Sequence, residues 1–294
     1  MIEIHPARWW QAGENGSVIC KLCLRHCIVP EGKSGYCGVR RNKKGSLLSL
    51  SYGHPVSVAI DPIEKKPLAR FMPRTRTLSF GTFGCNLGCI FCQNDSLSRG
   101  DYGEEETPFV PPERFIELAR AHHCPSISYT YNEPTVFAEY IIDIARLARK
   151  AGLKNVLVSN GFIEQDAALE LYPLMDAANI DMKGFSEEFY HRMCAGSLRP
   201  VLESLKLLYR LGLHLEITTL VIPGQNDNPA ELTDWFGWVA SNLDLEVPLH
   251  FSAYHPAFKC NIPPTRPDSL YEIQELAFRM GCKNVFLGNI RPQY

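Results

Sequence analysis

Two groups of cysteines are the residues of this chain whose type and spacing could do chemistry. The first group, Cys85, Cys89 and Cys92, has a CxxxCxxC spacing on a short loop that contains glycine. Thiolates arranged in this way bind iron–sulfur clusters or zinc. A closed zinc site needs a fourth ligand nearby, and the next candidates, at residues 122–124, lie a helix away. Three thiolates on a cube of four irons leave one iron open for a cofactor. The spacing therefore predicts a 4Fe-4S cluster, with structural zinc and a plain electron-transfer cluster as alternatives.

The second group places four thiols in one short segment near the start of the chain. They are Cys20, Cys23, Cys27 and Cys37, and the segment around them has no long helical pattern. So small and loop-rich a piece buries too little apolar surface to hold its shape without a metal. We therefore expect zinc at these cysteines, with an auxiliary iron–sulfur cluster as the alternative.

The elements that position the first group begin near residue 77. From there, short apolar strands alternate with amphipathic helices in units of roughly 30–40 residues, which is typical of βα repeats and a parallel sheet. The strand candidates are residues 78–82, 127–131, 156–160, 178–182, 215–222, 248–254 and 285–288. Six or seven strands are too few to close an eightfold barrel. We therefore predict an α/β fold: a partial parallel (β/α)6-type TIM barrel at residues 76–294, preceded by a cysteine-rich, metal-binding N-terminal cap and connector at residues 1–75.

Polar residues follow nearly every predicted strand. In a parallel βα barrel the carboxyl ends of the strands face a common mouth, so polar side chains there are candidates for an active site. The candidates are Cys85, Asn132, Glu133, Ser159, Asn160, Asp181, Lys183, Asn226, Asp227, His250, Ser252, Tyr254, His255 and Asn289.

These motifs together resemble the radical S-adenosylmethionine (SAM) superfamily. Within it, the chain is similar to the AmmeMemoRadiSam-system radical SAM enzymes, which are related to the pyruvate formate-lyase activating enzymes. The resemblance extends over nearly the whole chain, including the Cys20 to Cys37 group, and is carried by residues 61–68, 85–94, 129–134, 159–161 and 181–184. In this chain Tyr131 and Asn132 replace two glycines of the family's Gly-Gly-Glu motif.

The resemblance implies an activity and its cofactors. Cys85, Cys89 and Cys92 would hold a 4Fe-4S cluster whose fourth iron is chelated by S-adenosyl-L-methionine. An electron donor such as flavodoxin or ferredoxin would reduce the cluster. SAM would then be cleaved to a 5′-deoxyadenosyl radical, which abstracts hydrogen from a substrate. An activase-like reaction on a protein and a reaction on a small molecule both stay open.

The resemblance also implies which side chains contact SAM. Glu133 would meet the amino group, and the polar end of the third strand, Ser159 and Asn160, would touch the cofactor. Asp181 and Lys183 would contact the ribose and the carboxylate. His250 would lie near the ribose or the adenine.

Composition limits the partners of the protein. The 294 residues are 45% hydrophobic, and 30 Lys and Arg against 32 Asp and Glu give a formal net charge of −2. No global field attracts nucleic acid or anionic membrane, and the basic stretch at residues 40–44 is expected to be a solvated surface. No apolar run approaches the roughly 18 residues of a membrane span, and the start does not resemble a signal peptide. We therefore expect a cytoplasmic protein with no membrane or nucleic-acid partner. The functional alternative is a non-catalytic zinc-binding scaffold protein.

The connector at residues 52–74 carries too many charges for a core and too many apolar residues for a free linker. We expect it to pack the cap along the wall or rim of the barrel, so that cap loops help to close the mouth.

Overall fold

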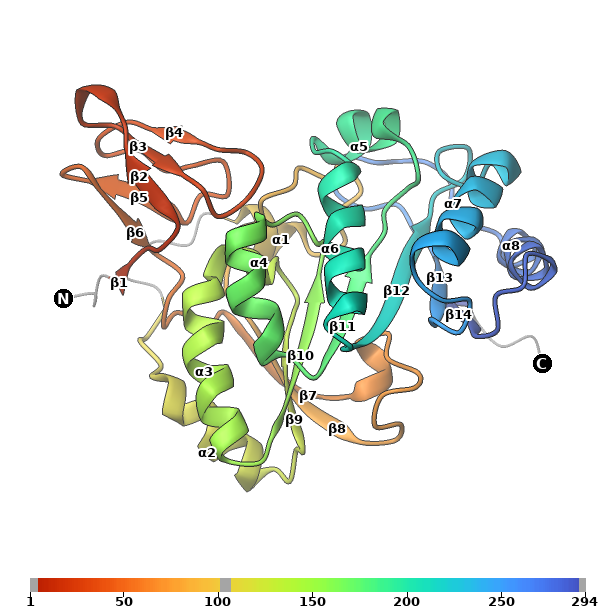
Figure 1. The fold of residues 1–294 in the computed structure, drawn as a ribbon, viewed down its shortest axis with the longest axis horizontal. Coiled ribbons are helices and arrows are strands. Elements are labelled where there is room, and N and C mark those ends of the chain that lie inside the picture. Colours follow the sequence, from red (N-terminus) through yellow and green to blue (C-terminus); the bar gives the residue numbers. More distant parts are fainter. Residues whose placement is uncertain (1–4, 101–106, 291–294) are drawn as a thin grey trace.

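The structure is a computed structural model that describes residues 5–100 and 107–290. Its centre is one sheet with the strand order β14-β13-β12-β11-β10-β9-β8-β7 (Figure 1). The strands are β7 (Ser57–Pro62), β8 (Arg76–Gly81), β9 (Ser126–Tyr129), β10 (Lys154–Ser159), β11 (Ala177–Asp181), β12 (His214–Val221), β13 (Leu249–Ala253) and β14 (Val285–Gly288). Strands β8 to β14 pair in parallel with their neighbours in chain order. The predicted α/β fold with a mostly parallel sheet is therefore confirmed, and all seven predicted strands form.

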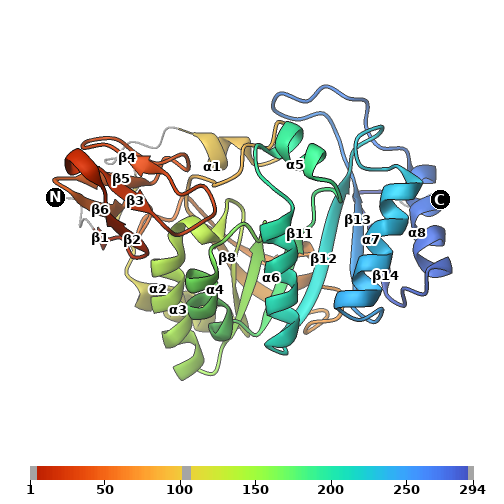
Figure 2. The ribbon, with the colours of Figure 1, turned by 45° about the horizontal axis from the view of Figure 1, so that its top comes forward.

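Helices cover one face of this sheet (Figures 1 and 2). They are α2 (Pro112–Ala121), α3 (Ala138–Lys150), α4 (Gln165–Leu171), α6 (Arg199–Arg210), α7 (Pro229–Asn242) and α8 (Pro267–Arg279), while the short helices α1 (Asp95–Arg99) and α5 (Glu187–Cys194) lie at the upper rim (Figure 2). Phe80 of β8 packs against Phe115 of α2 and Tyr140 of α3, so it points toward the helices. Because side chains alternate along a strand, Thr77 and Ser79 point to the opposite face, which has no helical layer. None of the helices in residues 5–100 and 107–290 is both long and apolar enough to cross a membrane.

The cap consists of two small antiparallel sheets rather than loops alone. One sheet has the order β1-β6-β5 and the other β2-β3-β4. Their strands are β1 (His5–Pro6), β2 (Trp10–Ala12), β3 (Val18–Cys20), β4 (Ile28–Val29), β5 (Arg40–Lys43) and β6 (Ser46–Ser49). Val18, Leu22 and Val39 are buried in the same hydrophobic core as the barrel residues. The cap therefore packs directly on the barrel, at the left in Figure 1.

A buried ion pair joins the cap to α3 and corrects one expectation. Arg40 was expected to be solvated with its basic neighbours, but it is only 1% exposed. Its Nη1 lies 2.9 Å from Oε1 and 3.1 Å from Oε2 of Glu139, which is 2% exposed. A buried charge persists only when it is paired and hydrogen-bonded, and the carboxylate that pairs with Arg40 lies far along the sequence.

The connector contributes to the barrel itself. Strand β7 pairs antiparallel with β8, so the connector runs along the wall as expected. The segment after it packs Ile63 and Leu68 against Val156 and Ala177. The carboxylate of Glu216, near the start of β12, accepts hydrogen bonds from the backbone at residues 69 and 70. This segment therefore closes the end of the sheet opposite the mouth. The domain boundary at residue 75 stays a prediction. Strand β7 precedes that boundary but belongs to the same sheet as the barrel strands.

Candidate cluster and SAM site

The loop that carries Cys85, Cys89 and Cys92 leaves the end of β8 and lies against the cap. Gly84 has a φ of +87°, and a Cβ atom there would be 2.5 Å from the carbonyl oxygen of Cys37. A Cβ atom on Gly88 would be 2.2 Å from the phenol oxygen of Tyr36. Gly84 therefore requires glycine, because its backbone is left-handed and cap backbone approaches it closely, whereas a side chain at residue 88 would displace the Tyr36 phenol.

The other side of the loop is held by backbone hydrogen bonds. Gly88 N–H donates to the carbonyl of Cys194 at 2.7 Å, and Ile90 N–H donates to that of Met193 at 3.0 Å, both at the end of α5. The carbonyl of Ile90 accepts from Lys259 N–H at 2.9 Å. Cap, α5 and the loop after β13 together fix the position of the three thiols.

The surroundings of the thiols fit a 4Fe-4S cluster. The Sγ atom of Cys85 accepts from Leu87 N–H at 3.4 Å, and the Cys92 thiol hydrogen-bonds to Ser98 at 3.7 Å. Burial raises the pKa of the Cys85 thiol, and a bound cluster would hold it as thiolate. Arg99 acts electrostatically on Cys85 and Cys89. The donor set is three thiols, which is the number that a four-iron cluster with one open iron requires.

The described side chains do not form a recognisable site for a single metal ion. In the described ranges, no group of three or more His, Cys, Asp or Glu side chains is arranged to hold one. The four cap thiols are nevertheless neighbours: burial raises the pKa of Cys23 to about 12, and the charges of Cys37, Cys20 and Cys27 also act to raise it. Zinc at these cysteines stays a prediction.

The structure brings Glu133, Ser159 and Asn160 together beside the cysteine loop. The buried carboxylate of Glu133 accepts from Ser159 Oγ at 2.7 Å, from Asn160 N–H at 2.9 Å and from Thr135 N–H at 2.9 Å. Burial raises the pKa of Glu133, and these hydrogen bonds oppose that effect. The side-chain nitrogen of Asn160 lies 3.8 Å from Cys85 Sγ. These three predicted contacts thus form one rigid polar group next to the predicted cluster.

A second predicted group lies at the end of β11. Lys183 Nζ is 3.0 Å from Asp181 Oδ2. Burial would lower the pKa of Lys183, but the nearby charges of Asp181 and Cys89 raise it above its usual range. The ammonium therefore stays charged beside the cysteine loop, where a carboxylate could pair with it.

His250 forms a different contact from the one expected of a SAM ligand. In the sheet, His250 of β13 pairs with Thr218 of β12, and Thr218 pairs with Asp181 of β11, so the three residues lie in one row. Its Nε2 lies 2.6 Å from Glu216 Oε2, and its ring stacks on Phe286 with centroids 5.1 Å apart. No described contact links it to the cysteine loop, so its role toward SAM stays a prediction.

Two polar clusters on the helix-free face of the sheet were not predicted from the sequence. One is Glu216 with its histidine partners. The other joins Tyr131, whose phenol donates to Asp61 Oδ2 at 2.6 Å, to Lys66, whose Nζ donates to the same oxygen at 2.7 Å. Tyr131 has a φ of +72°, a left-handed conformation that suits the glycine of the family motif and is rare for a tyrosine. In the sequence, the only signal for this second cluster was the tyrosine in place of that glycine. A bulky residue held in a left-handed backbone often marks a functional constraint.

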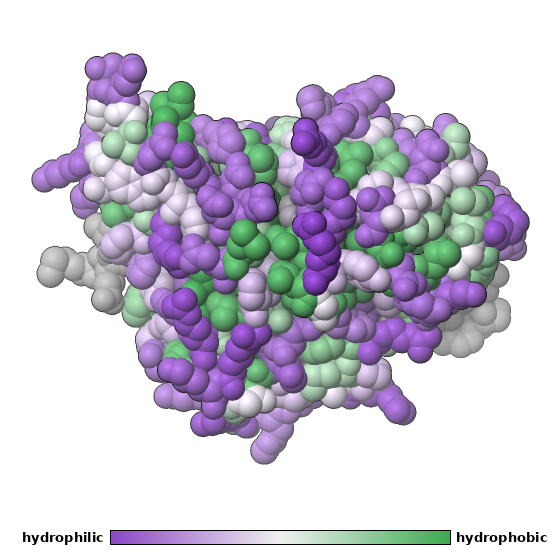
Figure 3. Space-filling view, in the orientation of Figure 1, coloured by the Kyte–Doolittle hydropathy of each residue, from purple (hydrophilic) through white to green (hydrophobic). Residues whose placement is uncertain are grey.

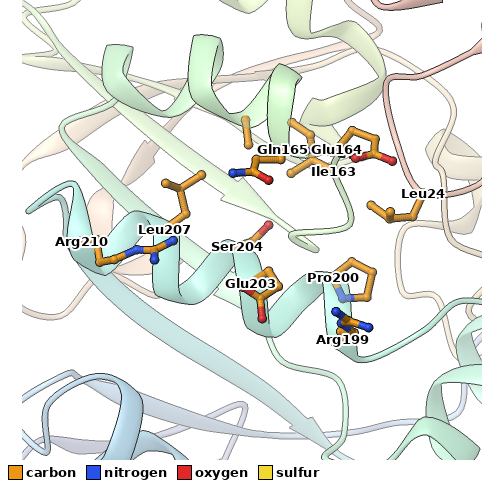
Figure 4. A pocket seen from close by; sticks show the side chains of 11 residues that line it. Leu24, Ile163, Glu164, Gln165, Arg199, Pro200, Glu203, Ser204, Leu207 and Arg210 are labelled. Atoms are coloured by element: carbon orange, nitrogen blue, oxygen red, sulfur yellow. Dashed lines mark hydrogen bonds between the residues drawn. The ribbon is translucent and has the colours of Figure 1, made fainter.

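A hollow of about 360 Å³ lies on the helix side, between α4 and α6 (Figure 4). It is lined by Leu24, Ile163, Glu164, Gln165, Ala168, Arg199, Pro200, Glu203, Ser204, Leu207 and Arg210. Hydrophobic side chains are among those that gather in this part of the face (Figure 3). None of the predicted site residues lines it.

Known proteins are similar to this chain in sequence or in fold. An uncharacterized protein of Methanocaldococcus jannaschii, MJ0808, is 42% identical over 290 residues, which cover 98% of this chain and 86% of that protein. The pyruvate formate-lyase 1-activating enzyme of Escherichia coli is 26% identical over 161 residues, which are 51% of this chain and 64% of the enzyme, so less than two thirds of its length is matched.

Among solved structures, Streptococcus suis SuiB has a TM-score of 0.55 at 12% identity, covering 72% of this chain and 48% of that one. A radical SAM methyltransferase from Sphaerobacter thermophilus has a TM-score of 0.53 at 13% identity, covering 74% and 67%. At such low identity these likenesses show the fold alone. The family model of the radical SAM superfamily matches residues 80–236, which include the cysteine loop, Glu133 and the Asp181–Lys183 pair. The chain therefore belongs to the radical SAM superfamily.

Proposed function

We propose that the protein is a radical SAM enzyme that holds a 4Fe-4S cluster on Cys85, Cys89 and Cys92 and abstracts hydrogen from a substrate. The observation that carries the proposal is the position of the cysteine loop. It lies at the carboxyl end of β8, with the Glu133 group and the Asp181–Lys183 pair beside it. Cluster and SAM, when bound, supply a 5′-deoxyadenosyl radical by one-electron cleavage of SAM.

The side chains of this chain would bind and orient SAM. Glu133 is held by three donors and offers a fixed acceptor to an amino group. Ser159 and Asn160 fix that carboxylate and extend the polar surface toward Cys85. Lys183 is charged and suits a carboxylate, Asp181 suits a ribose diol, and His250 would lie near the ribose or adenine.

The finer assignments extend this proposal. The four cap cysteines would bind a metal, zinc first and an auxiliary cluster as the alternative. The reductant would be an electron-transfer protein such as flavodoxin or ferredoxin. The reaction would be activase-like in abstracting a hydrogen atom, and the relatedness to the activating enzyme supports that class without identifying a protein or small-molecule substrate.

The test is anaerobic reconstitution with iron and sulfide, followed by dithionite and SAM. We expect release of 5′-deoxyadenosine, and Cys89→Ala should abolish both the release and the spectrum of the SAM-bound cluster. Cys282→Ala is the matched control, because this buried cysteine lies at the far end of the sheet, beyond α8. Wild-type protein with a full cluster that never cleaves SAM would refute the proposal. Zinc alone at both cysteine groups in protein isolated without oxygen would favour the scaffold.

A further inference from the structure

The cap places an aromatic side chain directly on the predicted cluster loop. Tyr36 is 43% exposed, and its phenol oxygen lies where a Cβ atom of Gly88 would otherwise be. Gly88 stands between Cys85 and Cys89, so the ring contacts the loop at a position that carries no side chain of its own. The backbone N–H of Tyr36 also donates to the thiol of Cys27 at 3.4 Å, which anchors the ring from the cap side.

Two guanidinium groups flank this ring. The Cζ atom of Arg25 lies 3.4 Å from the ring centroid and that of Arg99 lies 5.1 Å from it. Arg25 donates to the carbonyls of Asn86 and Ala195, and Arg99 donates to the carbonyl of Leu87. In the part of the chain that the structure describes, neither guanidinium is paired with a carboxylate. Among those residues, neither positive charge is neutralised by an ion pair.

The same surface lies within electrostatic reach of the thiols. Nη2 of Arg99 lies 3.5 Å from the position that a Cβ atom of Gly88 would take, and Gly88 is the residue before Cys89. Figure 2 shows α1, which ends at Arg99, at the upper rim between the cap and α5. The rim is therefore a place where the outside of the protein approaches the predicted cluster through one ring and one loop.

We propose that the Arg25–Tyr36–Arg99 surface is the docking site of a small acidic electron-carrier protein, and that electrons enter the cluster there. This inference rests on the proposed function. Complementary charge steers association and fixes the orientation of a transient complex, and exposed Tyr with Arg is typical of the energetic centre of an interface. In the transfer step the reduced carrier loses one electron and the oxidised cluster gains it. No bond forms or breaks, and no proton moves.

The experiment measures binding and reduction separately, with a purified flavodoxin as the probe. Binding of the oxidised flavodoxin to the reconstituted enzyme is followed by titration at low ionic strength, in wild type, Arg25→Glu and Arg99→Glu. Arg25→Lys keeps the charge, and Arg210→Glu is the matched control in the arginine-bearing hollow of Figure 4. Bleaching of the cluster's visible absorbance is then compared with reduced flavodoxin and with dithionite as reductants.

We expect the two charge reversals to weaken flavodoxin binding by about tenfold or more, and salt to weaken wild-type binding in the same direction. Arg25→Lys and Arg210→Glu should bind like wild type. Bleaching by dithionite should be unchanged in Arg25→Glu, while bleaching by flavodoxin slows. Unaltered binding in both reversals, or equal loss in Arg210→Glu, overturns the docking site. Equal slowing with both reductants also overturns it, because a damaged loop would then explain the loss. Binding requires no SAM cleavage, so a failed docking site is distinguishable from a failed proposed function, which shows as no 5′-deoxyadenosine with dithionite.

Discussion

Replacing Glu216 by glutamine tests how the closed end of the barrel is held. The buried carboxylate accepts from the backbone N–H of Ala69 at 2.9 Å and of Arg70 at 2.8 Å. It also contacts Nε2 of His214 at 2.8 Å and of His250 at 2.6 Å. A glutamine side chain at this position would retain one acceptor oxygen and turn an NH2 group toward donors. Each carboxylate oxygen serves one histidine and one connector N–H, so the substitution leaves one such pair facing an NH2 group in place of an acceptor.

The magnitude follows from the pKa of this carboxyl group. Burial alone would raise the pKa of Glu216, but the hydrogen bonds from His214, His250 and the backbone lower it from 4.5 to about 2. Such a lowering corresponds to about 3 kcal/mol of folded-state stability at neutral pH. A depressed carboxyl pKa stabilises fully above the unfolded value, and the contribution is lost as the pH falls from 4.5 toward 2. The difference between wild type and variant should shrink in that window.

Urea unfolding of anaerobically purified protein, followed by circular dichroism between about pH 7 and about pH 3, measures this difference. We expect Glu216→Gln to lower the free energy of unfolding by about 3 kcal/mol at pH 7 and by much less near pH 3. Glu203→Gln is the control, because its ion pair with Lys206 on α6 is exposed and should contribute less than about 1 kcal/mol. Equal midpoints for wild type and Glu216→Gln at pH 7 would refute the reasoning. So would a difference that persists undiminished at pH 3.

Three further substitutions test other parts of the structure. Glu139→Ala leaves the charge of Arg40 buried without its partner and should cost about 3–5 kcal/mol in urea unfolding; an unchanged midpoint would contradict the buried pair. Gly81→Ala would place a Cβ atom 2.4 Å from a backbone carbonyl at the end of β9, so we expect poor cluster incorporation, measured as iron bound per chain, and full incorporation would argue against this close approach. Lys66→Met removes one of two cations from Asp61 and should lower the free energy of unfolding by about 1–3 kcal/mol, whereas a gain in stability would show that burying the charge costs more than the pair returns.

The parallel strands could be predicted because each is a short apolar run bounded by polar residues. Strand β12 is the instructive case, since its predicted range, 215–222, differs from His214–Val221 by one residue at each end. Strand β7 was not predicted: its sequence from Ser57 to Pro62 is short, ends in proline and carries Asp61, and only pairing with β8 makes it a strand. The cap strands have two to four residues each, too few for a periodic pattern.

The site could be predicted where the chemistry is local and not where it is distant. The three thiols of the loop are close in sequence, so their spacing alone indicated them. Asp181 and Lys183 were indicated by their place at the end of one predicted strand and by the family resemblance. Glu216 interrupts an apolar run, and nothing near it in sequence shows that its backbone donors lie 146 and 147 residues away. Arg40 was misread for the same reason, because the residue that pairs with it is 99 positions further along.

The separation between Arg40 and Glu139 also orders events during synthesis. A chain emerges from the ribosome from its N-terminus, and domains generally fold in that order. Here the cap has emerged about 99 residues before the carboxylate that neutralises its buried arginine. Until α3 is complete, closing the cap would strand a cation away from water, at a cost of several kcal/mol. The cap is thus expected to stay open until α3 begins to form, so that its four cysteines are exposed on the nascent chain until then.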